Sequence, residues 1–143
     1  MRALGVDLGA RRIGVAVSDP SGTIASPLQV LERSGDMAGD HRRLAAIVRE
    51  VGAERVVVGV PRSLSGDLGP AARQALAEVE AMGEALAVPV ETHDERLTTV
   101  SAHRAMRAGA VKRDARRRTV DKVAAAVILQ SWLDGRRLRG GEP

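Results

Sequence analysis

Asp7 is an acid in a place where local structure does not call for one. It lies inside the apolar segment LGVDLG, which is typical of a buried strand, and aspartate is depleted in strands. Burying an ionised carboxylate is costly unless a cation compensates its charge, so a metal ion or an arginine is expected beside it. The alternative is a strand-end aspartate that caps a turn or pairs with Arg11.

Two further acids stand at the ends of predicted elements. Glu95 follows a predicted strand, in the segment HDERLTT, and open α/β sheets gather their ligands just beyond the carboxyl ends of strands. Its neighbour Asp94 is an alternative functional acid or a cap for the next helix, for which Thr98 is another candidate. Asp121 begins the apolar stripe VDKVAAAVILQ of the last predicted helix, where the helix dipole alone would favour an acid.

Together, Asp7, Glu95 and Asp121 predict a metal site. Three converging carboxylates would repel one another unless divalent cations lay between them. Oxygen ligands favour Mg²⁺ or Mn²⁺ over zinc, and the absence of cysteine excludes a thiolate site or a cysteine nucleophile. Two such ions about 4 Å apart can activate water and stabilise the leaving oxygen of a phosphodiester. We therefore expect the three acids to be both catalytic and metal-binding.

The hydrophobic pattern predicts elements that would position these acids. Strands are expected at 3–8, 13–18, 22–30, 55–60 and 88–92, and helices at 41–51, 70–87, 98–108 and 119–133. The order βββαβαβα gives an α/β fold, with a mixed five-stranded sheet and helices packed on its faces. The first strand is then central, beside the strand through Val58. Residues 1–143 are expected to form one domain, with 136–143 as a frayed polar tail.

Composition narrows the class of protein. Hydrophobic residues make up 44% of the chain, but Trp132 is its only aromatic residue, so the core must be aliphatic and bases cannot stack on a series of rings. No run approaches the roughly 20 apolar residues of a membrane span, and no signal-peptide pattern begins the sequence. We expect a soluble cytoplasmic protein without a membrane partner.

Positive charge is concentrated late in the chain. Residues 1–95 hold 10 Lys and Arg against 14 Asp and Glu, whereas residues 96–143 hold 12 against 4. A basic end fits a polyanion-binding surface. The general Arg and Ala bias of the chain is an alternative explanation of this positive charge. The candidates for nucleic-acid contact are Arg11, Arg96, Lys112, Arg113, Arg116, Arg117 and Arg118, most of them in a charged linker at 110–118.

Two weaker signals are a glycine-containing loop and three histidines. Gly59, Pro61 and Gly66 are expected in a loop whose backbone can approach a phosphate near the site, or which is an ordinary strand-to-helix connection. The histidines, which show no metal-ligand spacing and are expected at the surface, are His41, His93 and His103.

Four segments resemble a known family in order and spacing. They are GVDLGARRIGVAVSD (5–19), VVVGVPRSLSGDLGP (56–70), HDERLTT (93–99) and VDKVAAAVIL (120–129). The chain is similar through nearly its whole length to the YqgF family, also called RuvX or the pre-16S rRNA nucleases. The resemblance implies a ribonuclease H-like fold and a metal-dependent nuclease whose acids fall at Asp7, Glu95 and Asp121. Junction resolvases tend to carry a further acid one turn after the last, and here that residue is Ala124.

Four functions remain open on the sequence. The leading one is an endonuclease on structured nucleic acid, most of all one that processes the 5′ end of the 16S ribosomal RNA precursor. The alternative is a Holliday junction resolvase acting on branched DNA, for which a homodimer would suit a symmetric junction. A non-catalytic nucleic-acid or ribosome-binding protein is a lesser alternative. The segment DLGARRIGVAV also resembles the first phosphate loop of actin-like ATPases, but those need two such domains.

Overall fold

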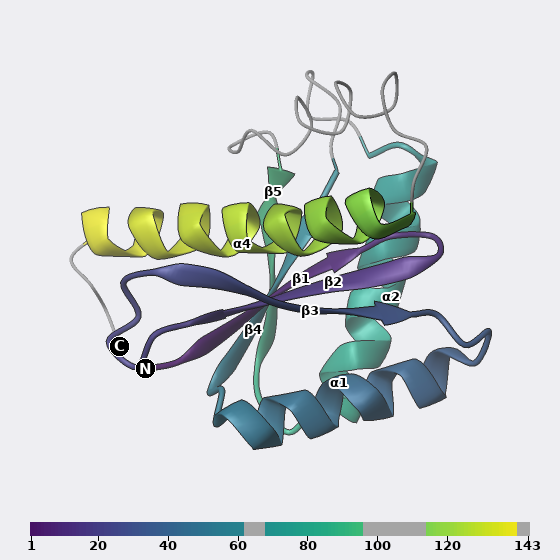
Figure 1. The fold of residues 1–143 in the computed structure, drawn as a ribbon, viewed down its shortest axis with the longest axis horizontal. Coiled ribbons are helices and arrows are strands. Elements are labelled where there is room, and N and C mark those ends of the chain that lie inside the picture. The colour runs from purple at the N-terminus through teal and green to yellow at the C-terminus, as the bar shows by residue number, and fades with distance from the viewer. Residues whose placement is uncertain (62–67, 96–113, 140–143) are drawn as a thin grey trace.

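The computed structural model describes residues 1–61, 68–95 and 114–139 (Figure 1). Its elements, in chain order, are β1 (Ala3–Leu8), β2 (Arg12–Ser18), β3 (Ala25–Glu32), α1 (Met37–Val51), β4 (Arg55–Val60), α2 (Pro70–Ala85), β5 (Val90–Asp94) and α4 (Asp114–Leu138). The helix expected at 98–108 lies outside the described residues. All five strands and the other three helices are present in the predicted order.

The five strands form one mixed sheet in the order β3-β2-β1-β4-β5. The hairpin of β1 and β2 and the pair β2 and β3 are antiparallel, whereas β4 lies parallel to β1 and to β5. The crossovers through α1 and α2 explain the change of direction, because a parallel neighbour must be reached from the far end of the sheet. The prediction that β1 is central, beside the strand through Val58, is confirmed.

Side chains alternate between the two faces of the sheet along each strand, so the core consists of two apolar clusters, one on each face. Leu4 and Val6 of β1 pack with residues of α1 and α2, such as Leu44 and Met82. Ala3 of β1 lies on the other face, which α4 covers. The α4 cluster contains Ala3, Ala16, Val57, Ala124, Ala125, Ala126, Ile128, Leu129, Trp132 and Leu133. In Figure 1, α4 accordingly runs across one side of the strands, and α1 and α2 lie on the other.

The predicted bounds of the last helix are wrong at both ends. Instead of spanning 119–133, α4 begins at Asp114 and ends at Leu138. The basic segment before Asp121 is therefore helical from Asp114 onward rather than a linker, and residues 136–138 are not a frayed tail. Arginine and alanine are good helix formers, and packing on the sheet supports the chain through Gly135.

Three strands also differ from their predicted bounds, and of these β2 differs only in beginning one residue earlier, at Arg12. β3 spans Ala25–Glu32 and includes Pro27, which pairs with Ala16 beside a register shift. Proline is tolerated there because β3 is an edge strand and the bulge relieves the ladder. β5 begins at Val90, after Pro89, and continues to Asp94, which pairs with Val60. Glu95 therefore still follows directly on the end of a strand.

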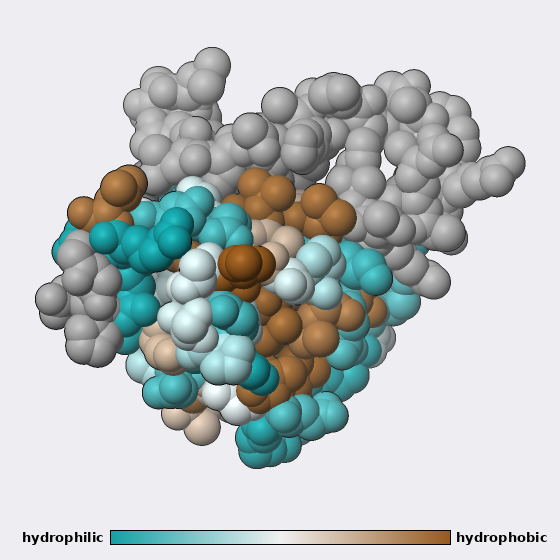
Figure 2. Space-filling model, turned by 60° about the vertical axis from the view of Figure 1, so that its left-hand side comes forward, coloured by the Kyte–Doolittle hydropathy of each residue, from teal (hydrophilic) through white to brown (hydrophobic). Residues whose placement is uncertain are grey.

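The described surface is mixed in polarity. Figure 2 brings the left-hand side of Figure 1 forward and shows a narrow apolar strip bordered by hydrophilic residues. Of the helices in the described ranges, none is both long and apolar enough to cross a membrane.

Candidate active site at the carboxyl end of the central strand

Asp7 lies near the carboxyl end of β1 and is only 3% exposed. Since Ala3 belongs to the α4 cluster and side chains alternate along a strand, Asp7 is on the face that α4 covers. Its partner on β2 is Gly14. On the other side, β1 pairs Val6 with Val58 of β4, so Asp7 comes beside Gly59. The central acid thus has a glycine on each flank.

Gly14 lets α4 approach the sheet closely at Asp121. A Cβ atom at Gly14 would lie 2.7 Å from the carbonyl carbon of Asp121 and nearer still to its carbonyl oxygen. The backbone of Asp121 therefore rests on the strand position directly opposite Asp7. This contact places the start of the apolar stripe of α4 over the end of the β1–β2 hairpin.

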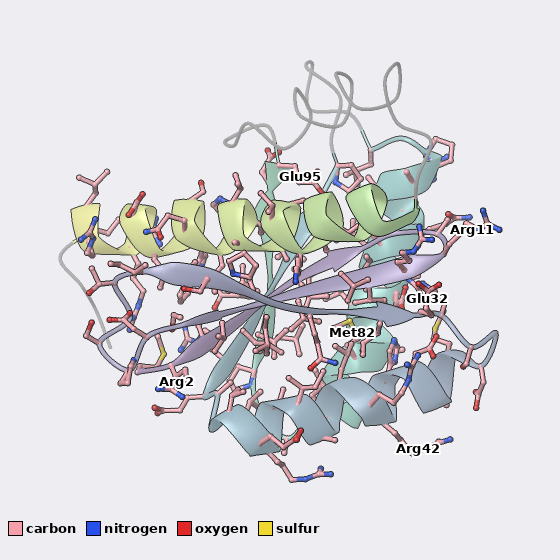
Figure 3. The ribbon with its side chains drawn as sticks, in the orientation of Figure 1. Arg2, Arg11, Glu32, Arg42, Met82 and Glu95 are labelled. Carbon is pink, nitrogen blue, oxygen red and sulfur yellow. The ribbon has the colours of Figure 1, made fainter. Side chains whose placement is uncertain are left out.

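Gly59 does the same for Glu95 on the other flank. A Cβ atom at Gly59 would lie 3.1 Å from Cγ of Glu95 and 2.5 Å from Cδ1 of Ile128. Glu95 is only 2% exposed, and Figure 3 shows it at the tip of β5, above α4. Gly59 is the fifth residue of β4, within the strand expected at 55–60 and not in the loop near the site to which it was also assigned. Pro61 follows the strand, and Gly66 lies outside the described residues.

Asp7, Glu95 and Asp121 therefore belong to one end of one face of the sheet, with Asp7 between the other two. Among residues 1–61, 68–95 and 114–139, however, no three His, Cys, Asp or Glu side chains are grouped closely enough to hold a metal ion together. Asp94, the alternative acid, ends β5 and pairs with Val60. Ala124, one turn after Asp121, is buried in the α4 cluster.

The predicted nucleic-acid contacts are only partly described. Arg11 is exposed at the tip of the β1–β2 hairpin, where Figure 3 shows it pointing outward. Arg96, Lys112 and Arg113 lie outside the described residues. The backbone of Arg116, Arg117 and Arg118 belongs to the first turns of α4, but their side chains are not among the described ones.

A buried ionic network holds the turn that follows Asp7, and it was not predicted from the sequence. Arg33, just after β3, donates from Nε to the carbonyl oxygen of Gly9 at 2.9 Å. Its two terminal nitrogens donate to the carboxylate of Glu78 on α2, each at 2.9 Å. His41 of α1, predicted at the surface, is instead 2% exposed, and its Nε2 lies 2.8 Å from the same carboxylate.

The network fixes the charge of Glu78. Burial favours the neutral acid, but the hydrogen bonds from Arg33 and His41 outweigh it and hold the pKa of Glu78 below its ordinary value. The only sequence signal for this network was His41 among the apolar residues of α1 at helical spacing. Arg33 and Glu78 look like ordinary surface residues in the sequence, since nothing local shows that the two elements meet.

His93 lies on the α4 side of β5 and contacts that helix. Its Nε2 is 2.9 Å from Oγ of Ser131. Burial lowers the pKa of His93, and Arg139 lowers it further, although Asp94 and Glu91 act in the opposite direction. The neutral imidazole is therefore favoured, which suits a contact that ties β5 to α4.

A cleft adjoins Glu95 on the side of the sheet that α2 covers. Its volume is about 780 Å³, and its lining includes Leu8 and Gly9 from the hairpin, Pro61 after β4, and several residues of α2. Arg33 and Glu78 of the buried network also line it. The cleft and the acids thus share one edge of the sheet.

Known proteins resemble this chain over most of its length. Residues 1–135 match the family model described as "RuvX: Holliday junction resolvase". A protein of Mycobacterium sp. (strain KMS), named "Putative pre-16S rRNA nuclease", is 48% identical over 137 residues, which are 95% of this chain and 81% of the relative. A protein of the same name from Mycobacterium tuberculosis (strain ATCC 25177 / H37Ra) is 47% identical, over 94% of this chain and 79% of the relative.

Solved structures agree with the fold. RuvC of Thermus thermophilus in complex with a Holliday junction substrate superposes with a TM-score of 0.60 over 96% of both chains, at 19% sequence identity. A second Thermus thermophilus RuvC structure gives a TM-score of 0.58 at 18% identity, with the same coverage. At such identities the likeness concerns the fold alone, and it confirms the ribonuclease H-like class predicted from the sequence.

Proposed function

Because the chain belongs to the RuvX family, we propose that it is a divalent-metal-dependent endonuclease that processes the 5′ end of the 16S ribosomal RNA precursor. The observation that carries the proposal is the placement of Asp7. It is a buried carboxylate on the central strand, with the backbone of Asp121 packed over one neighbouring strand and Glu95 over the other. The names of the mycobacterial relatives supply the substrate.

The donor chemistry of this edge fits Mg²⁺ or Mn²⁺. Asp7 and Glu95 are both nearly inaccessible to solvent, and carboxylate oxygens are the ligands that these ions prefer. They would be the principal ligands, with Asp121 as the third. When bound, such an ion would supply electrostatic stabilisation of the charge that develops on the scissile phosphate.

The protein itself would fix the positions of the acids and of the substrate. The close contact of α4 at Gly14 and the packing of Glu95 against Gly59 fix the two outer acids relative to Asp7. The Arg33 bond to the Gly9 carbonyl holds the turn after Asp7. Arg11 at the exposed hairpin tip, and the basic residues that precede Asp121, would bind phosphates of the substrate on either side of the cut. Rigid elements therefore carry the acids, as a site of this precision needs.

Asp7→Asn tests the proposal, since it preserves the shape of the side chain and removes the charge. We expect the variant to fold, to lose cleavage of a precursor 16S rRNA fragment in Mg²⁺, and to lose the rise in melting temperature that Mn²⁺ gives the wild type. Asp36→Asn is the matched control, because Asp36 is an exposed acid whose side chain makes no helix cap. A folded Asp7→Asn variant that cleaves as the wild type does would refute the metal site.

Branched DNA is the second candidate substrate. It is favoured by the description of the matching family as a Holliday junction resolvase. Phosphate contacts cannot separate the two substrates, because both backbones carry the same charge. Cleavage of a four-way DNA junction and of the precursor RNA fragment, measured in one Mg²⁺ buffer, distinguishes them by kcat/KM.

A further inference from the structure

The cleft beside Glu95 is a second binding feature of the same edge, distinct from the acids themselves. Its volume of about 780 Å³ is within the range of roughly 300–1,000 Å³ found for small-ligand pockets. Leu8 and Gly9, which line it, follow Asp7 directly, and Glu95 lines it too. A strand whose phosphate lies at the acids would therefore have the cleft next to that phosphate.

The charges that line the cleft argue against a phosphate inside it. Arg33 is its only lining cation among the described residues, and that side chain is engaged through Nε with the Gly9 carbonyl and through both terminal nitrogens with Glu78. Glu78 is paired with that arginine, and Glu95 is a proposed metal ligand, so the described lining leaves no uncommitted cation for a phosphate. An uncharged occupant fits this lining better than an anion.

The walls of the cleft fit a flat, mostly apolar group with one polar edge. Ala71 and Ala75 of α2 and Leu8 of β1 offer small or aliphatic surfaces. Gln74, on the same side of α2, adds an exposed carboxamide, which can donate and accept at the hydrogen-bonding edge of a base. An unpaired nucleobase has this combination of two apolar faces and a polar edge.

We propose that the cleft holds one unpaired nucleobase of the substrate strand, next to the scissile phosphate. The inference rests on the proposed function, since it takes the cleft to be continuous with a site that acts on nucleic acid. Ala71 and Ala75 form the wall against which the base lies, and Gln74 reads its edge. The protein then selects an unstacked nucleotide at the cut, although it has a single aromatic residue in its whole sequence.

Ala71→Leu tests the cleft by filling it. Ala71 is exposed in the first turn of α2, and leucine is a good helix former, so the variant should fold. Ala81→Leu is the matched control, because Ala81 is an exposed alanine of the same helix that does not line the cleft. The probes are a precursor 16S rRNA fragment and a series of the same fragment, each with an abasic residue at one nucleotide around the cut.

For the wild type and for Ala81→Leu, we expect one abasic position to raise KM about tenfold, the cost of losing one bound base. For Ala71→Leu, KM on the intact fragment should already be about tenfold higher, and the same abasic position should have no further effect. If no abasic position changes KM in the wild type, or if Ala71→Leu weakens intact and abasic fragments equally, the cleft does not hold a base.

Binding in Ca²⁺ separates this inference from the proposed function, because it is measured without cleavage. In one outcome, the wild type fails to cleave and yet binds the intact fragment more tightly than the abasic one, with Ala71→Leu removing that preference. This result would refute the nuclease and support the base site. Normal cleavage without that preference would leave the nuclease in place and overturn the base site. A chain that neither cleaves nor binds the fragment would overturn both.

Discussion

Gly14→Ala is the change that most directly tests how the third acid is positioned. Gly14 is paired with Asp7 across the β1–β2 hairpin. A Cβ atom there would lie 2.7 Å from the carbonyl carbon of Asp121. The obstacle is the backbone of α4 rather than the end of a flexible side chain, so the helix itself must move.

The size of the movement follows from packing distances. Non-bonded carbon atoms are stable at about 3.5–4.0 Å, so α4 must recede by roughly 1 Å at Asp121. Overpacking of this kind typically costs about 1–3 kcal/mol of unfolding free energy. A displacement of about 1 Å in a catalytic group can reduce the rate about 100-fold. We therefore expect a folded but less stable protein. Its kcat/KM should fall by much more than the loss of folded protein accounts for.

Two measurements separate these effects. Urea unfolding gives the free energy, and cleavage of the precursor fragment well below the unfolding midpoint gives kcat/KM. Gly83→Ala is the control, since a Cβ atom there meets nothing within 4 Å and alanine should add about 1 kcal/mol to helix α2. An unchanged unfolding free energy for Gly14→Ala would refute the docking of α4. Reduced stability with unchanged kcat/KM would mean that Asp121 is not part of the site.

Two other predictions concern charge. Replacing Arg116, Arg117 and Arg118 by Ala should flatten the slope of log affinity for RNA against log salt by about 2 if all three contact phosphates, and an unchanged slope would contradict this. The pKa of Glu78 is lowered in the folded state from its ordinary value of 4.5. The ionised carboxylate therefore stabilises the folded protein above pH 4.5, and this stabilisation is lost as the pH falls below 4.5 toward the lowered pKa. Glu78→Gln should lower the free energy of unfolding by about 3 kcal/mol at neutral pH. Measured by urea unfolding, the stability of this variant should fall less than that of the wild type as the pH drops below 4.5. The exposed Glu80→Gln should keep the acid sensitivity of the wild type.

Much of the fold could be predicted because its strands are locally distinctive. The segments at 3–8 and 55–60 are short, mostly apolar and followed directly by glycine or proline, and both strands have the bounds that were predicted. The sheet order followed from connection rules once the order of elements was known. The bounds of α4 did not follow, since the helix includes a basic segment that was expected to be a linker and continues past a glycine.

In the candidate site, too, the residues with a local sequence signal could be predicted and the others could not. Asp7 and Glu95 could be singled out as candidates because an acid within or just after an apolar strand contradicts local preference. The network of Arg33, Glu78 and His41 was not, because it joins residues up to 45 positions apart whose local surroundings are unexceptional. Whether charged residues meet in the interior depends on how helices cross the sheet, which periodicity does not determine.

Glycine explains why these acids lie at this edge and not elsewhere. Gly14 and Gly59 occupy strand positions on either side of Asp7, where glycine costs about 0.5–1 kcal/mol relative to alanine. Strand stability therefore gives no reason for them. A Cβ atom at one would strike the backbone of Asp121, and at the other it would crowd Glu95 and Ile128. The sheet thus loses strand stability at the two positions where a side chain would separate the outer acids from the central one, as the proposed three-acid site would require.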